Sequence, residues 1–310
     1  MTFKDTTFLA FTPELAAQYS TGRGHSYPQP LYQAVLDFHT GDHDLVLDVG
    51  TGPGKVLFDF LHHFQRGIGC DTSTQMIEQA KRNAHKLGTS VVDRSRFFVA
   101  RGEDCVDYLR PDEVGGVDMI VVAMAAHWFD MPKFYASAHK ALKAGGTLAM
   151  WTCSSQYCHP SVRNHQRIQE ILCDLEDNML KPHVKPGNVM SRNAYEDLDL
   201  PWQLPASETL FEESSFVRKD WDRHGVPSAP VLPDGTPGPF LFSEEETLEQ
   251  LEAGLGAASM VIRWRQANPV KANGPEDAVS LTISRLREAL DGKESFLNAP
   301  SCTLLLMRKA

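Results

Sequence analysis

Residues 48–54 combine a carboxylate with three glycines at alternate positions. Asp48 lies in an apolar run, and Gly50, Gly52 and Gly54 follow it in the order D-x-G-x-G-x-G. Glycine allows a tight bend and lets a ligand approach the backbone with no Cβ in the way. An apolar pattern with helical spacing resumes after Lys55, so the bend joins a strand to a helix. The stretch predicts a binding site for a nucleotide, a nucleoside or another charged ligand.

Two phosphate-binding motifs do not match this spacing. A P-loop has Ser or Thr after Gly-Lys to hold magnesium, whereas Val56 follows Lys55 here. A dinucleotide motif has the spacing G-x-G-x-x-G, and counting from Gly50 and Gly52 puts Lys55 where the third glycine belongs. The spacing therefore disfavours ATP, GTP and NAD as ligands of this bend.

A second carboxylate ends the next predicted strand. Asp71 lies 23 residues after Asp48, where a carboxylate can accept hydrogen bonds from both hydroxyls of a ribose. NAD-binding proteins place an acid similarly. Asp71 therefore indicates a nucleoside without choosing which one.

The elements that must position these residues alternate between buried strands and helices from about residue 40 to 152. This alternation predicts a parallel sheet built from βαβ units. Thr72 and Gln75 predict a capping box at the start of the second helix of this region. The five predicted strands are 45–49, 67–71, 96–100, 117–123 and 146–152.

The alternation stops after residue 152. Helical patterns cover 161–180 and 277–290, a loop rich in glycine and proline covers 225–239, and Ser243 predicts the cap of a helix that runs to about 266. We expect a doubly wound, mostly parallel seven-stranded sheet with a helical insertion after the fifth strand. The expected parts are an N-terminal helical lid (1–40), a ligand-binding core (41–153), a mostly helical substrate cap (154–242), and C-terminal helices with the last strands (243–310).

Composition and charge favour a soluble, cytoplasmic protein with a small-molecule partner. The 310 residues are 42% hydrophobic, and their net charge of −10 gives no reason to attract nucleic acid or an anionic membrane. We find neither a signal-peptide pattern nor an apolar run of about 18 residues. Six cysteines lack the paired spacing of a zinc site, so we expect reduced thiols and no metal. The oligomeric state is not predicted.

The sequence resembles the class I S-adenosylmethionine-dependent methyltransferases over about residues 19–152. The D-x-G-x-G-x-G spacing is similar to their first motif. The segments 117–123, 126–130 (AHWFD) and 142–151, together with the Y-x-x-x-R-x-x-Y-P pattern from Tyr19 to Pro28, resemble one subgroup, which includes the trans-aconitate methyltransferases.

This resemblance implies S-adenosylmethionine as cofactor, S-adenosylhomocysteine as product, and a set of cofactor-binding residues. The glycine bend would line the cofactor, and Asp71 would hold its ribose. Arg101 stands where the family often has an aspartate on the adenine, so the next two residues are expected to replace that contact. The implied set is Tyr19, Arg23, Asp48, Gly50, Thr51, Gly52, Gly54, Asp71, Ser73, Met76, Gly102, Glu103 and Ala123.

Methyl transfer is an in-line displacement at a sulfonium, so holding the acceptor in line and excluding water supplies most of the rate. His127 follows the fourth strand and could act as a base for a hydroxyl acceptor or only orient a loop. Trp128 and Trp151 could wall an acceptor pocket or belong to the core. These features predict an O-methyltransferase for a carboxylate or hydroxyl of a small organic acid or specialised metabolite.

Three other functions remain open at this point. A related enzyme could keep the cofactor pocket and catalyse a rearrangement, cyclisation or elimination. A non-catalytic subunit could bind the cofactor to support a partner. An NAD oxidoreductase would need a Tyr or His with a lysine nearby, which we do not find in the sequence.

Overall fold

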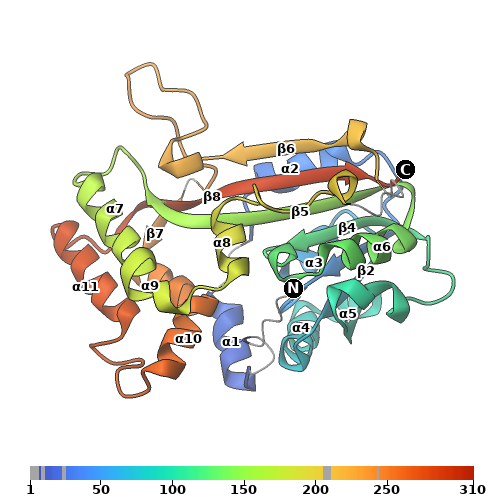
Figure 1. The fold of residues 1–310 in the computed structure, drawn as a ribbon, viewed down its shortest axis with the longest axis horizontal. Helices are drawn as coiled ribbons and strands as arrows, with labels where there is room; N and C mark the ends of the chain where they lie inside the picture. The colour runs from blue at the N-terminus through green and yellow to red at the C-terminus, as the bar shows by residue number, and fades with distance from the viewer. Residues whose placement is uncertain (1–6, 8–10, 23–25, 205–210, 243) are drawn as a thin grey trace.

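The computed structural model describes residue 7 and residues 11–22, 26–204, 211–242 and 244–310 (Figure 1). Its centre is one sheet with the strand order β3-β2-β1-β4-β5-β8-β6, and β7 pairs separately with β8. The first five strands are parallel, and β8 is antiparallel to β5, β6 and β7. The predicted doubly wound, mostly parallel sheet is confirmed.

All five predicted strands of the core are present in the sheet. β5 is longer than predicted, because its far end continues to pair with β8 beyond the parallel part of the sheet. β6 was not predicted. The strands are β1 (Leu45–Val49), β2 (Arg66–Asp71), β3 (Ser95–Val99), β4 (Val117–Ala123), β5 (Leu142–Cys158), β6 (Val217–Trp221), β7 (Glu245–Thr247) and β8 (Ser295–Arg308).

Helices cover both faces of the sheet, which explains why the central strands are apolar without alternation. Leu31 of α2 and Phe60 of α3 are buried against one face, and Phe134 of α6 is buried against the other. The helices are α1 (Pro13–Gly22), α2 (Gln29–Phe38), α3 (Lys55–Phe60), α4 (Thr74–Leu87), α5 (Thr89–Arg94), α6 (Met131–Ala141), α7 (His165–Asp174), α8 (Pro186–Arg192), α9 (Leu248–Gly256), α10 (Ser259–Ala267) and α11 (Ala278–Ala289).

A helical cap lies at one end of the sheet, on the left in Figure 1. Its helices α7, α9, α10 and α11 share a hydrophobic core of their own, to which Ile171, Leu251, Val261 and Ile283 belong. These helices come from two stretches of chain, one on each side of β6 and the loop that follows it. The cap is thus built both from the predicted insertion and from the C-terminal part.

Two helix starts differ from the sequence prediction. Ser73, not Thr72, caps α4: its hydroxyl accepts a hydrogen bond from the Met76 amide over 3.4 Å. The helix predicted from Ser243 to about 266 is two helices, α9 and α10, and Thr247 caps the first of them. Ser243 lies outside the described residues. In both cases a neighbouring hydroxyl competes for the same role, and local sequence does not separate them.

Candidate functional site

A cavity of about 1150 Å³ opens at the carboxyl ends of β1, β4 and β5, beneath the cap. This edge is where open α/β sheets bind ligands. The glycine bend and the end of β4 line one side of the cavity, which we call the sheet end. The far end of β5, residues 176–177 and 244–246, and residues from α8, α9 and β8 line the other, which we call the cap end. The volume exceeds that of a typical single-ligand pocket and suits a cofactor beside an acceptor.

The three glycines of the bend all have positive φ, and each has a different reason to lack a side chain. A Cβ on Gly50 would lie 2.5 Å from the Ala125 Cβ, and one on Gly54 would lie 2.7 Å from the Phe58 ring. A Cβ on Gly52, in contrast, would meet nothing within 4 Å. Gly50 and Gly52 line the cavity, whereas Gly54 caps α3 behind it. The bend thus presents bare backbone to the cavity at Gly52.

Asp71 lies directly behind this bare backbone. Its Oδ2 accepts a hydrogen bond from the Gly52 amide at 3.0 Å, and its Oδ1 accepts one from the Ser73 amide at 2.8 Å. Asp71 itself is not among the described residues that line the cavity. Each carboxylate oxygen keeps a second lone pair, so Asp71 can hold the bend and still accept ligand hydroxyls.

Asp48 is a buried carboxylate on the cavity wall, with only 1% of its surface exposed. Its Oδ2 accepts a hydrogen bond from the Thr51 hydroxyl at 2.7 Å, and Thr51 also lines the cavity. Its Oδ1 has no hydrogen-bond partner among the described residues. Burial, with a smaller effect from the negative charge of Asp71, raises the pKa of Asp48 to about 7. A ligand that brings a positive charge or a donor would satisfy this oxygen.

His127 and Trp128 both line the cavity from the short helix Ala126–Trp128, which follows β4. The His127 Nδ1 lies 3.1 Å from the hydroxyl oxygen of Tyr195, a residue that is 2% exposed. Trp128 packs against α8, where a Cβ on Gly187 would lie 2.5 Å from the indole ring. α8 and the segment that follows it therefore hold both side chains in place.

Several predicted contacts lie elsewhere. Met76 is buried with Phe11 and Ala16 rather than on the cavity wall. Gly102 packs against the Phe129 ring, which would lie 2.9 Å from a Cβ at this position. The Glu103 Oε1 accepts a hydrogen bond from the Asp130 amide at 2.8 Å. Ser73, Gly102 and Glu103 are likewise absent from the described lining, so the adenine contacts expected from them stay a prediction.

Trp151, for which both an acceptor wall and a core position were open, lies in the hydrophobic core. It is fully buried on β5 and makes an edge-to-face contact with Tyr27 at 5.4 Å between ring centroids. The parallel pairing of β5 with β4 turns its side chain toward the face covered by α2 and α3. The core interpretation therefore applies to Trp151.

The remaining predicted residues are on the wall or outside the described chain. Tyr19 and Ala123 line the cavity, together with Met124. Arg23 lies outside the described residues. Sequence reasoning missed Tyr195, Glu246 and Asn298, because each reaches the site from a distant part of the chain with no motif around it.

Two kinds of feature are absent from the part of the chain that the structure describes. It contains no group of three or more His, Cys, Asp or Glu side chains that could hold a metal ion. It also contains no helix that is both long and apolar enough to cross a bilayer.

Residues 46–146 match the family described as "Methyltransferase domain". The chain is 33% identical over 138 residues to the probable S-adenosylmethionine-dependent methyltransferase CRG1 of Saccharomyces cerevisiae, over 44% of this chain and 44% of that protein. It is 23% identical over 268 residues to the probable methyltransferase ltbC of Aspergillus luteorubrus, over 84% and 85% of the two chains. The first three relatives are matched over only 44%, 43% and 37% of their length.

A solved structure shares the fold across most of the chain. The putative type II methyltransferase from Anaeromyxobacter dehalogenans superposes with a TM-score of 0.57 at 20% identity, over 91% of this chain and 95% of that one. This likeness shows that the chain shares the fold of that structure. The trans-aconitate subgroup stays a prediction.

Proposed function

We propose that this chain, whose residues 46–146 match the methyltransferase-domain family, transfers the methyl group of S-adenosylmethionine to a carboxylate or hydroxyl oxygen of a small molecule. One observation carries the cofactor assignment. Asp48, whose buried Oδ1 has no hydrogen-bond partner among the described residues, lines a cavity that also reaches the bare backbone of Gly52. A flat nucleoside with a positive charge fits such a wall, because it needs close backbone approach and satisfies the carboxylate.

The proposed cofactor contacts follow the sheet end of the cavity. The bend at Gly50, Thr51 and Gly52 would lie against the nucleoside, Asp71 would accept hydrogen bonds from the ribose hydroxyls, and Asp48 would face the positive charge. Tyr19 and Ala123 line the same cavity and would flank the methionine portion. Arg23, Ser73, Gly102 and Glu103 complete the proposed set by resemblance.

The chemistry needs little from the protein beyond position. When bound, the cofactor supplies an electrophilic methyl group on a sulfonium. The cavity wall would hold the acceptor oxygen in line with that methyl, and the cap would exclude water. His127 would accept the proton of a hydroxyl acceptor or orient it, because its ring lies on the wall between the sheet end and the cap. A carboxylate acceptor would need no base.

The proposal allows two chemical classes of acceptor. The resemblance to the trans-aconitate subgroup supports a small organic acid, and the polar cap end supports a hydroxylated specialised metabolite equally well. A cytoplasmic location and a role in specialised metabolism belong to the same proposal. A rearrangement enzyme with the same cofactor pocket is the alternative, because only the cap would have to differ.

Two measurements test the proposal in sequence. Calorimetric titration with S-adenosylmethionine and with NADH should show binding of the first alone. Mass spectrometry of the purified protein incubated with the cofactor and a small-molecule extract should then show products that gain one methyl group. Cofactor binding with conversion of a substrate but no gain of methyl would favour the rearrangement alternative. Binding of NADH instead would refute the cofactor assignment.

A further inference from the structure

The described lining of the cavity is strongly acidic. Six carboxyl groups line it, against two side chains that carry a permanent positive charge, Lys55 and Arg192. Five of the six belong to the cap end. The six carboxyl groups are those of Asp48, Glu176, Asp177, Glu244, Glu245 and Glu246.

Arg192, the cation of the cap end, already forms ion pairs with two of these carboxyl groups. The Arg192 Nη1 lies 2.7 Å from the Asp177 Oδ1, and its Nε lies 3.3 Å from the Glu176 Oε2. Ser155 joins the same group, with its hydroxyl donating to Glu176 at 2.6 Å. Lys55 begins α3 beside the glycine bend, at the sheet end. An acceptor carboxylate at the cap end would therefore compete with two built-in carboxylates for one guanidinium.

Beyond this ion cluster, the wall contains a buried amide with an unused acceptor. Asn298 of β8 is 4% exposed, and its Nδ2 donates to the Glu246 Oε2 at 2.7 Å and to the Gln156 Oε1 at 3.1 Å. Both of its donor hydrogens are thus used. Its Oδ1 is buried and has no hydrogen-bond partner among the described residues. A buried oxygen without a donor is costly, so this position calls for a ligand that donates.

Glu246 adds a carboxylate to the same wall. Burial raises its pKa, and the hydrogen bond from Asn298 opposes that rise. An ionised carboxylate accepts hydrogen bonds but cannot donate them. Glu246 and the Asn298 Oδ1 therefore make the wall selective for hydroxyl or ammonium groups and unfavourable for another anion.

We propose that the acceptor is an uncharged or cationic small molecule that presents a hydroxyl or amino group to Glu246 and Asn298, and not a polycarboxylate. The inference rests on the proposed methyltransferase function and narrows it. It selects the hydroxyl acceptor over the organic acid, since the far end of an organic acid would meet the acidic wall. The base required for a hydroxyl acceptor is then His127, on the wall of the same cavity.

The first test uses the wild-type protein. Cofactor with an isotopically labelled methyl group is incubated with a small-molecule extract that has been divided by ion exchange into anionic, neutral and cationic pools. We expect label in the neutral or cationic pool. Label confined to the anionic pool would overturn the inference while leaving the methyltransferase function intact. Label in no pool, with cofactor binding intact, would refute the proposed function and this inference with it.

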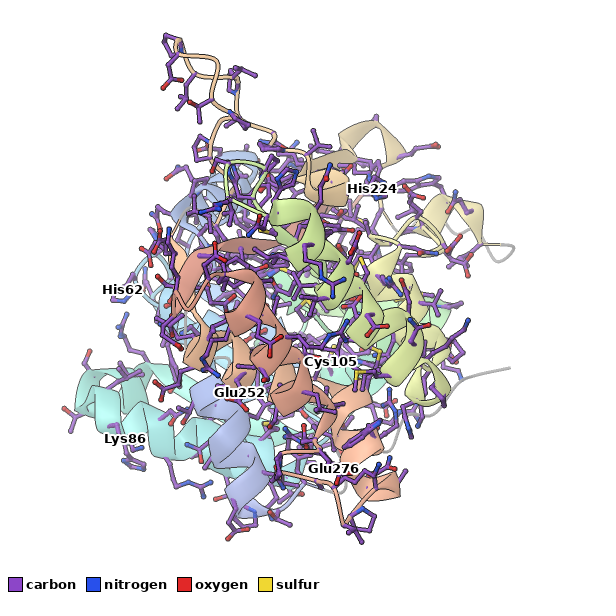
Figure 2. All side chains as sticks on the ribbon, turned by 90° about the vertical axis from the view of Figure 1, so that its left-hand side faces the viewer. His62, Lys86, Cys105, His224, Glu252 and Glu276 are labelled. Carbon is purple, nitrogen blue, oxygen red and sulfur yellow. The ribbon has the colours of Figure 1, made fainter. Side chains whose placement is uncertain are left out.

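The second test uses matched variants on whichever labelled acceptor is recovered. Glu246→Gln keeps an oxygen for the Asn298 amide but removes the charge, and should raise the KM of the acceptor about tenfold without changing the KM of the cofactor. Glu252→Gln is the control: this residue of α9, labelled in Figure 2, belongs to the cap but not to the described lining. Equal effects of the two substitutions, or none from either, would overturn the role of Glu246. Cofactor titration of both variants shows that each is folded.

Discussion

The imidazole of His127 and the phenol of Tyr195 lie 3.1 Å apart, measured from Nδ1 to the hydroxyl oxygen. The contact joins the sheet end of the cavity to the segment after α8, 68 residues away in the sequence. A partner on one ring nitrogen sets the orientation and tautomer of a histidine. Because Nδ1 is committed to Tyr195, proton transfer by this ring would take place at Nε2.

Removal of the Tyr195 hydroxyl should therefore slow methyl transfer. We expect Tyr195→Phe to lower kcat roughly tenfold, about the value of one buried hydrogen bond, with little change in the KM of the cofactor. The pH at which kcat is half-maximal should also move, since the ring loses its partner. Steady-state kinetics across a pH range measure both.

Tyr135→Phe is the matched control for this substitution. Tyr135 is also fully buried, and its hydroxyl donates to the Asp199 carbonyl at 3.0 Å, away from the cavity. It should lose comparable stability and keep its pH profile. If the two variants lose kcat equally with unchanged profiles, Tyr195 has only a structural role.

Gly52 offers a test of the bare backbone. Its φ is +53°, and Gly52→Ala should cost roughly 1–2 kcal/mol of stability from backbone strain alone. The added methyl group would also project into the cavity, where the cofactor is proposed to lie. We expect at least about a tenfold loss of cofactor affinity in calorimetry, from steric exclusion at a close contact.

Gly235→Ala is the control that separates the effect of backbone strain from steric exclusion of the cofactor. Gly235 has φ +84°, a Cβ there would also meet nothing within 4 Å, and it lies in the loop after β6, outside the described lining. The control should lose similar stability and bind the cofactor normally. A Gly52→Ala protein with normal affinity would contradict the proposed position of the nucleoside.

The parts of the fold that local sequence encodes were predictable. The apolar runs of β1 and β4 are covered on both faces, so their patterns are continuous and their bounds were predicted to the residue. β6 was missed because it lies at the edge of the sheet and contains Arg218, Lys219 and Asp220. Charged residues are typical of edge strands, and they hide the strand pattern.

The same distinction applies to the site. Asp48 and Asp71 lie at the carboxyl ends of β1 and β2, and the glycines follow β1. The strand ends of a parallel sheet meet at one edge, so the proximity of these residues could be predicted. Tyr195 contacts His127 from the segment after α8, and Asn298 lines the cavity from β8. Their positions depend on how α8 and β8 pack, and no spacing in the sequence records that packing. For Trp151 the sequence left a wall position and a core position both open, because a place at a strand end does not reveal which face the side chain takes.

The proposed contact of Asp71 with the ribose can be tested by combining a substitution of Asp71 with removal of the 2′-hydroxyl from the ligand. Asp71→Asn keeps one oxygen to accept from a backbone amide but removes the charge and one acceptor. We expect S-adenosylhomocysteine to bind roughly tenfold more weakly, as for one charge-assisted hydrogen bond. Its 2′-deoxy analogue should lose much less on the same substitution, because the hydroxyl that Asp71 holds is already gone.

Calorimetric titration of both ligands to both proteins completes this cycle. Equal losses for the two ligands would mean that Asp71 acts through the Gly52 bend and does not contact the 2′-hydroxyl. Asp93→Asn is a control at an exposed carboxylate of α5, outside the cavity, and should change neither affinity.

The raised pKa of Asp48 predicts a pH dependence of stability with a definite sign. In the folded protein without ligand its pKa is about 7, above the ordinary value of 3.8. Between these values the folded state binds more protons at this carboxyl group than the unfolded state does. The free energy of unfolding should therefore fall as the pH rises from about 4 to about 7, by at most about 1.4 kcal/mol per pH unit from this group.

Other carboxyl groups with raised pKa, such as Asp71 and Glu246, contribute in the same direction, so the comparison must be with Asp48→Asn. In urea titrations the variant should gain stability relative to wild type as the pH rises through this window. A difference in stability between the two proteins that stays constant with pH would contradict the burial of an uncompensated carboxyl group.

A cationic cofactor should favour the ionised form of Asp48. Wild type should therefore release a proton on binding near pH 6, seen as a dependence of the calorimetric heat on the buffer. Asp48→Asn should not show this release, and an equal release from both proteins would place the titrating group elsewhere.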